Sequence, residues 1–133
     1  RDWVLRFLYI CQIKSRIMEN AILNKSRNFA VRIVKCYRFL SETKHEHILS
    51  KQLLRSGTSI GANARESRNA QSRSDFTSKL SIALKEADET AYWLDVLHSG
   101  DYINDNMFTS LNNDCQEIIS ILTSIIKRLK KPT

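Results

Sequence analysis

Three glutamates, Glu66, Glu86 and Glu89, are the residues of this chain whose types and spacing could hold a metal ion. Di-metal four-helix bundles combine such carboxylates with Glu-x-x-His pairs on two helices, and none of these three glutamates has a histidine three residues later. His45 and His47 have no further ligand at a spacing suited to metal, so we interpret them as solvated loop residues. We therefore expect no metal site.

The sequence also has no recognisable catalytic or cofactor-binding motif. Ser-His-Asp catalysis needs a serine on a sharp nucleophile turn, and we find no segment that predicts such a turn. The three glycines form no phosphate-cradling loop. We expect a protein that is not an enzyme, with no catalytic residue and no cofactor.

Basic residues form a second group with possible chemistry, because arginine offers a planar fork that suits phosphate oxygens. On a helical projection of the second predicted helix, four of them lie within roughly 80° of arc, and a fifth lies nearer the core side. This candidate nucleic-acid-binding surface consists of Lys51, Arg55, Arg65, Arg73 and Arg68. The alternative interpretation is a solvated helix face.

A third pattern follows Phe76, where one helical face carries apolar residues and predicts a core-facing stripe up to Leu97. A different face, roughly 120° away, alternates large apolar side chains with carboxylates. That face consists of Ile82, Glu86, Glu89, Trp93 and Val96. We interpret it as a candidate oligomer interface; the alternative is a partly exposed tryptophan covered by long neighbouring side chains.

Helices must position all of these residues, because the chain has only three glycines and one proline. Apolar periodicity predicts helix one over about residues 25–40 and helix four over about 106–130. Thr43 and Glu46 have the spacing of a capping box at the start of helix two, which we expect to reach about Gln71. Ser72 or Ser74 is expected to cap helix three, which ends near Gly100 in a left-handed residue. Short joints between helices favour an all-α, antiparallel up-down-up-down four-helix bundle.

Gly57 and Gly61 lie on the predicted core side of helix two. Each glycine costs about 1 kcal/mol relative to alanine inside a helix, so we expect close packing against a neighbouring helix to offset them. The same Gly-x-x-x-Gly spacing occurs in membrane helix pairs. Charged residues surround it here and no apolar run reaches spanning length, so we expect no membrane association.

The first seventeen residues carry a short apolar pattern that is too short to span a bilayer and has no cleavage site after it. We expect residues 1–17 to be an N-terminal extension upstream of a natural start at Met18, with residues 18–133 forming the bundle domain. The extension could add a helical segment. Three widely spaced cysteines, Cys11, Cys36 and Cys115, suggest neither disulfides nor zinc, and we expect them to be reduced and buried in a cytoplasmic protein.

The stretch QLLRSGTSIGANARESRNAQSRSDF, followed by KLSIALKEADETAYWLDVL, resembles the signature of the bacterial four-helix-bundle family named after the 23S rRNA intervening sequence protein. The resemblance covers roughly residues 24–130. Gly61-Ala62-Asn63 and Glu89-Thr90 depart from the commonest form of that signature, which loosens any transfer of function. Residues at motif positions are Arg55, Ser59, Ile60, Asn63, Glu66, Phe76, Leu80, Ala83, Glu86 and Leu94.

The resemblance implies a homopentamer. Related accessory variability determinant proteins of diversity-generating retroelements use a basic pentameric surface to hold a reverse transcriptase and nucleic acid. By this resemblance, we expect a homo-oligomer that binds RNA or DNA or acts as an adaptor, encoded in a 23S rRNA intervening sequence or a similar element. The alternative is a protein–protein scaffold or reverse-transcriptase accessory protein without direct nucleic-acid binding.

Charge along the chain agrees with both alternatives. The net charge is +7, but residues 19–79 contribute +7 from twelve basic and five acidic residues, whereas residues 80–126 contribute −7 from one basic and eight acidic residues. A basic region attracts phosphates. Opposite charges on two halves of a chain also guide self-assembly.

Overall fold

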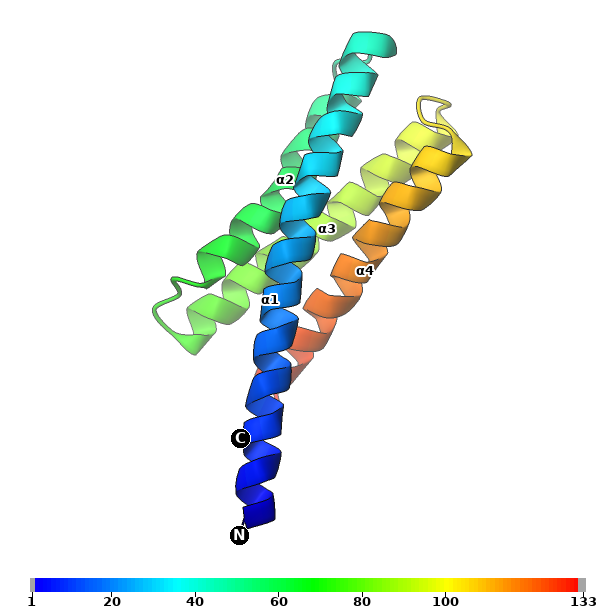
Figure 1. The fold of residues 1–133 in the computed structure, drawn as a ribbon. Coiled ribbons are helices and arrows are strands. Elements are labelled where there is room, and N and C mark those ends of the chain that lie inside the picture. Colours follow the sequence, from blue (N-terminus) through cyan, green and yellow to red (C-terminus); the bar gives the residue numbers. More distant parts are fainter. Residues whose placement is uncertain (1, 132–133) are drawn as a thin grey trace.

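The computed structural model describes residues 2–131. These residues form four α-helices and one π-helical turn: α1 (Asp2–Arg38), η1 (Phe39–Thr43), α2 (Leu49–Ser67), α3 (Arg73–Ser99) and α4 (Asp105–Leu129). Successive helices run antiparallel and α1 also packs against α4, as Figure 1 shows. The predicted all-α, up-down-up-down bundle is confirmed.

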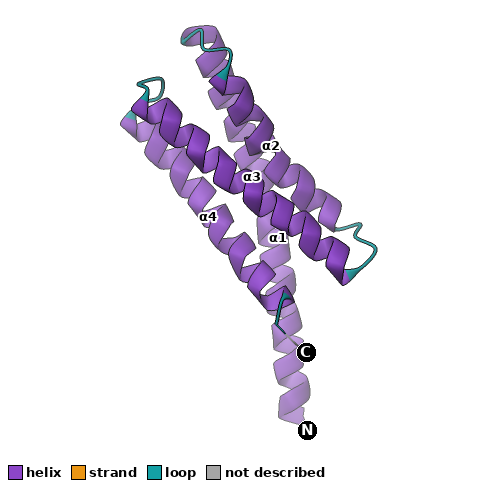
Figure 2. Cartoon of the chain, turned by 180° about the vertical axis from the view of Figure 1, so that it is seen from behind, coloured by secondary structure: helices purple, strands orange, loops and turns teal. Residues whose placement is uncertain are grey.

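Two helical hairpins, α1–α2 and α3–α4, build the bundle, and α1 passes behind the α3–α4 pair in the view of Figure 2. The apolar stripes of the sequence face inward. Phe29, Leu53, Leu94 and Leu122 are each at most 1% exposed, and they belong to four different helices. A core to which every helix contributes explains why these amphipathic segments are stable together, since most helical stability in proteins comes from tertiary packing of an apolar face.

Both glycines of α2 lie where α1 packs closely against it, and Gly57 is the more tightly packed. A Cβ atom at Gly57 would lie 2.8 Å from two side-chain carbons of Ile33, and one at Gly61 would lie 3.2 Å from the backbone oxygen of Ser26. The two helix backbones therefore approach more closely than alanine would allow at position 57. The expected role of the glycines is confirmed.

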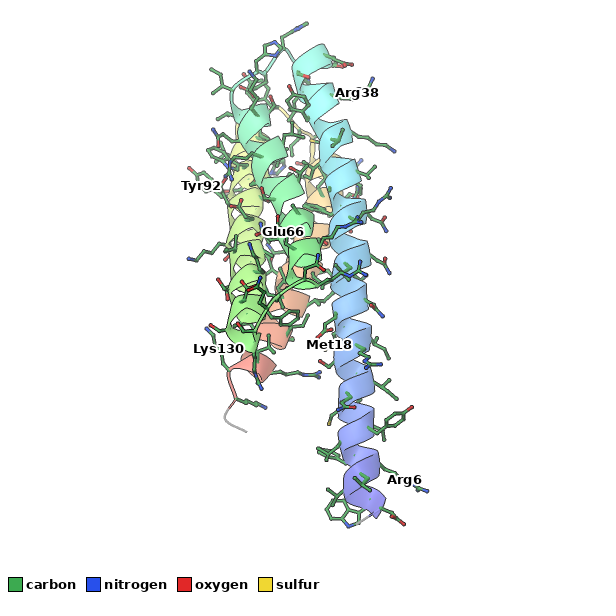
Figure 3. The ribbon with its side chains drawn as sticks, turned by 90° about the vertical axis from the view of Figure 1, so that its left-hand side faces the viewer. Arg6, Met18, Arg38, Glu66, Tyr92 and Lys130 are labelled. Carbon is green, nitrogen blue, oxygen red and sulfur yellow. The ribbon has the colours of Figure 1, made fainter. Side chains whose placement is uncertain are left out.

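The first helix differs from its prediction, because α1 is one continuous helix from Asp2 rather than a helix beginning near residue 25. Figure 3 shows Arg6 on a stretch of α1 that extends past the end of α4 near Lys130, whereas Met18 lies level with that end. Side chains before Met18 are mostly exposed, and Cys11 is exposed too, so its expected burial was wrong. Among the described residues, no helix is both long enough and apolar enough to cross a membrane.

Helix α2 departs from its prediction at both ends. The chain around Thr43 forms the π-helical turn, and α2 begins later, at Leu49, where the Glu46 carboxylate accepts from the backbone N–H groups of Ile48 and Ser50. The predicted capping box was therefore wrong, although Glu46 does cap the helix. Helix α2 also ends at Ser67, before Gln71.

At the two ends of α3, one expectation holds and one does not. Ser72 caps α3, as expected, by accepting from the Asp75 backbone N–H at 3.0 Å. After α3, Gly100 has φ of −85° and Asp101 adopts the left-handed conformation with φ of 66°. The prediction of a left-handed glycine was wrong by one residue, because an aspartate tolerates this conformation as well.

Candidate nucleic-acid interface

Arg55 lies at the centre of a charged cluster that joins two surfaces expected to be separate. Its guanidinium contacts the Glu86 carboxylate at 3.2 Å and forms a second ion pair with Glu89. The indole N–H of Trp93 donates to the same Glu89 carboxylate at 3.0 Å. The residue predicted to bind phosphate and three of the residues predicted to bind a neighbouring subunit thus interact within one chain.

This cluster changes the interpretation of both surfaces. Hydrogen bonding to Glu89 raises the pKa of Arg55 above its ordinary value. Desolvation lowers this pKa, but the negative charge of Glu86 raises it further. A phosphate would have to compete with two carboxylates for this guanidinium. Trp93 is half-buried and packs edge-on against Tyr92, with ring centroids 5.0 Å apart. Its position is accounted for within the chain, as in the covered-tryptophan interpretation.

The other members of the expected interface face are less covered. Ile82 is 39% exposed and Val96 is half-buried. Tyr92, which the sequence prediction did not include, is 58% exposed on the same helix. The exposed apolar side chains of α3 are therefore Ile82 and Tyr92 rather than Trp93.

Arg73 does not continue the arginine stripe, because α2 ends at Ser67 and Arg73 is the first residue of α3. Its guanidinium donates to the backbone oxygen of Leu129 at 2.8 Å. Arg73 therefore helps to satisfy a carbonyl group at the C-terminal end of α4. The projection that grouped it with Arg65 assumed a single continuous helix.

Arg65 and Arg68 agree best with the predicted phosphate surface. Both are exposed, and within residues 2–131 neither they nor Lys51 forms an ion pair. Lys51 lies on the same helix but lines neither of the grooves beside these arginines. The usable part of the predicted surface is therefore its Arg65–Arg68 end.

Two adjoining grooves lie beside these arginines. The first groove, of 350 Å³, lies between α1 and α2 and is lined by Arg27, Arg65 and Arg68 over a floor of small and apolar residues. The second groove, of 450 Å³, lies among α1, α2 and the start of α3, and Arg68 and Arg73 line it together with Glu19 and Phe76. Sequence analysis missed Arg27, because only the close approach of α1 to α2 brings it beside Arg65.

The described residues offer little for catalysis. Burial raises the pKa of the Cys36 thiol to about 11 and that of Cys115 to about 12, so both are protonated and unreactive at neutral pH. Residues Gly57 to Gly61 read Gly-Thr-Ser-Ile-Gly, which has the letters of a nucleophile motif, but they lie inside α2 rather than on a strand-to-helix turn. The Ser59 hydroxyl donates to the Arg55 carbonyl at 2.6 Å.

Metal-binding side chains do not gather in the described part of the chain: no group of three or more His, Cys, Asp or Glu residues could hold an ion there. The three glutamates considered as metal ligands, Glu66, Glu86 and Glu89, have other partners. Glu86 and Glu89 bind Arg55, and Glu66 pairs with Lys79 at 3.1 Å. The chain's one Glu-x-x-His spacing, Glu42 to His45, falls at the π-helical turn.

Fold and grooves together define an all-α, four-helix-bundle protein with an arginine-lined surface. The family model for the 23S rRNA-intervening sequence protein matches residues 18–124, and the chain belongs to that family. It is also similar to a crystal structure of a protein with unknown function from the S23 ribosomal protein family of Bacteroides thetaiotaomicron VPI-5482. The two share 55% sequence identity with a TM-score of 0.82, over 83% of this chain and 98% of that one. Among curated proteins, none matches the chain.

Proposed function

We propose that this protein is a non-enzymatic, cytoplasmic nucleic-acid-binding or adaptor protein that works as a homo-oligomer. The observation that carries the proposal is the set of three arginines, Arg27, Arg65 and Arg68, around one groove. Several other basic side chains of the bundle pair with carboxylates: Lys25 with Glu117 at 2.7 Å, for example. The guanidinium groups around the groove have no such neutralising partner among residues 2–131, so they are free to bind phosphate.

The first test is the salt dependence of binding to mixed RNA and DNA. Each phosphate contact contributes about −0.7 to −0.9 to the slope of log affinity against log salt. The double variant Arg65→Ala/Arg68→Ala should therefore flatten the slope by about 1.4 to 1.8. The matched control is Arg38→Ala/Lys44→Ala, which removes the same charge at the end of α1 and just after η1. Equal loss in both variants would show attraction by net charge alone and would contradict the proposal.

Assembly into a homopentamer belongs to the same proposal. The exposed Ile82 and Tyr92 on α3 support association, because each is a large apolar side chain that a second copy could cover. Light scattering on the purified protein measures the mass directly. The double variant Ile82→Ser/Tyr92→Ser should dissociate the oligomer, and a wild-type monomer would contradict this part of the proposal.

A second candidate function is a protein scaffold, or a reverse-transcriptase accessory protein, that does not touch nucleic acid. Its support is the exposed acidic face of α3, where Asp88 and Asp95 flank Tyr92 one turn away on either side. Such a face could dock on the free arginines of a neighbouring copy. Under this alternative, Arg65→Glu/Arg68→Glu would lower the mass seen by light scattering, and Asp88→Arg/Asp95→Arg added to it would restore that mass.

A further inference from the structure

The first and second grooves adjoin, because Leu23 and Arg68 line both of them. Arg68 therefore stands at the boundary between the two hollows. Arg65 lies three residues earlier on α2, about one helical turn away on the side of the first groove. Together the two grooves form one surface that is lined by Arg27, Arg65, Arg68 and Arg73.

Apolar floors distinguish these grooves from a flat basic surface. Ala30, Gly61 and Ala62 line the first groove, and Gly61 lies where α1 packs closely against α2. Phe76, which is half-buried, lies in the second groove. Each groove thus combines apolar side chains and arginines in one lining, together with polar residues such as Asn24 in the first groove and Ser72 in the second.

This combination suits a nucleic acid whose bases are unpaired. Proteins that bind single strands pair a positively charged groove with apolar or aromatic surfaces that receive base faces. A duplex stacks its bases inside and presents phosphates to its surroundings, so it could use the arginines but not the floors.

We propose that the two grooves bind single-stranded nucleic acid, with Arg27, Arg65 and Arg68 on the phosphates and Phe76 against a base. The inference rests on the proposed nucleic-acid-binding function and specifies its ligand and its site. Glu19 lies at the side of the second groove and repels phosphate there. The phosphate path therefore follows the first groove, and the second groove receives the base.

Fluorescence anisotropy of a labelled oligo-uridine, and of the same length of duplex RNA and duplex DNA, tests this at one low salt concentration. We expect the single strand to bind more tightly than either duplex. Oligo-thymidine in a parallel titration shows whether the grooves distinguish RNA from DNA.

Two variants locate the site. Phe76→Leu retains apolar packing but loses the aromatic face, and should weaken single-strand binding by about tenfold while leaving duplex binding unchanged. Arg27→Gln should weaken binding to the single strand, whereas its matched control Lys25→Gln should not, because Lys25 lies two residues away and pairs with Glu117. Circular dichroism melts confirm that each variant is folded, and Arg27→Gln tests the site even if Phe76→Leu unfolds.

The outcomes separate this inference from the function on which it rests. Equal binding of single strands and duplexes, with no effect of Phe76→Leu, would overturn the inference and leave nucleic-acid binding intact. Displacement of the oligo-uridine by an equal charge of poly-glutamate would also overturn it, by showing a general polyanion surface. Absence of binding to any nucleic acid at low salt would overturn both.

Discussion

Gly57→Ala should destabilise the bundle, against the usual effect of replacing glycine in a helix. In a helix interior alanine is favoured by about 1 kcal/mol. Here the added Cβ would lie 2.8 Å from both Cγ1 and Cγ2 of Ile33, a side chain with 0% exposure that has no free space to move into. Overpacking of this kind costs about 1–3 kcal/mol, so we expect a net loss of about 1 kcal/mol.

Urea unfolding followed by circular dichroism measures this change. With an m-value of about 2 kcal/mol/M, the midpoint should fall by about 0.5 M. Gly61→Ala is the matched control, because its Cβ would meet the Ser26 backbone oxygen at the less severe distance of 3.2 Å. There the contact and the propensity gain oppose each other, and we expect a change within about 0.5 kcal/mol.

A double-mutant cycle checks the cause. Ile33→Ala removes the two carbon atoms at 2.8 Å and leaves only the Cβ of residue 33 at 3.2 Å, so Gly57→Ala should be close to neutral or stabilising in that background. If Gly57→Ala raises the stability of the wild type, or if the two changes are additive, the reasoning about close α1–α2 packing is refuted.

Three further predictions concern charged residues. Arg55→Ala should lower the free energy of unfolding by at most about 1 kcal/mol, since the Arg55 side chain is 49% exposed. The same change should leave nucleic-acid affinity in the anisotropy assay unchanged. A loss of affinity as large as that of Arg65→Ala would mean that phosphate displaces the two glutamates from Arg55. Glu46→Gln should cost about 1 kcal/mol in urea unfolding at neutral pH. Burial raises the pKa of Glu46, but the backbone N–H groups of Ser50, Leu49 and Ile48 outweigh that effect and leave it below its usual range. The wild type should therefore be more stable than Glu46→Gln at pH values above the ordinary glutamate pKa, and this stability difference should disappear as pH falls through the lowered pKa of Glu46 in the folded protein. A stability difference that is constant with pH would contradict this. Glu19→Gln should strengthen binding of oligo-uridine by removing a negative charge from the second groove, and a weaker complex would place Glu19 in contact with the ligand.

Two arginines of the candidate site could be predicted from the sequence, but the full set of residues that line it could not. The sequence singled out Arg65 because it shares a helix face with Lys51 and Arg55, and Arg68 because it adds charge nearer the core side of the same helix. It could not show that Arg55 binds Glu86 and Glu89, because these residues belong to different helices and meet only when α2 packs on α3. Nor could it include Arg27, whose distance from Arg65 depends on how closely the two glycines let α1 approach α2.

Local rules also gave some helix ends and missed others. The Ser72 cap was predicted because a serine hydroxyl and the third N–H after it lie within four residues of chain. At the start of α2, the cap is Glu46, which precedes the first helical residue and accepts from the Ser50 backbone N–H. After the end of α3, Asp101 and not Gly100 has the left-handed backbone conformation. In both cases more than one neighbouring residue type suits the role, so local rules do not identify which residue fills it.

The amino-acid sequence by itself determined the helical class, the inward faces and the need for a close helix contact at Gly57. These properties follow from side-chain periodicity and from the conformational cost of glycine, which act within one helix. Tertiary structure alone decided which arginines remain free to bind phosphate and which are neutralised by carboxylates. Charge pairing acts over a few ångströms between helices, so it depends on the packing of α1, α2 and α3 and cannot be read from the order of residues.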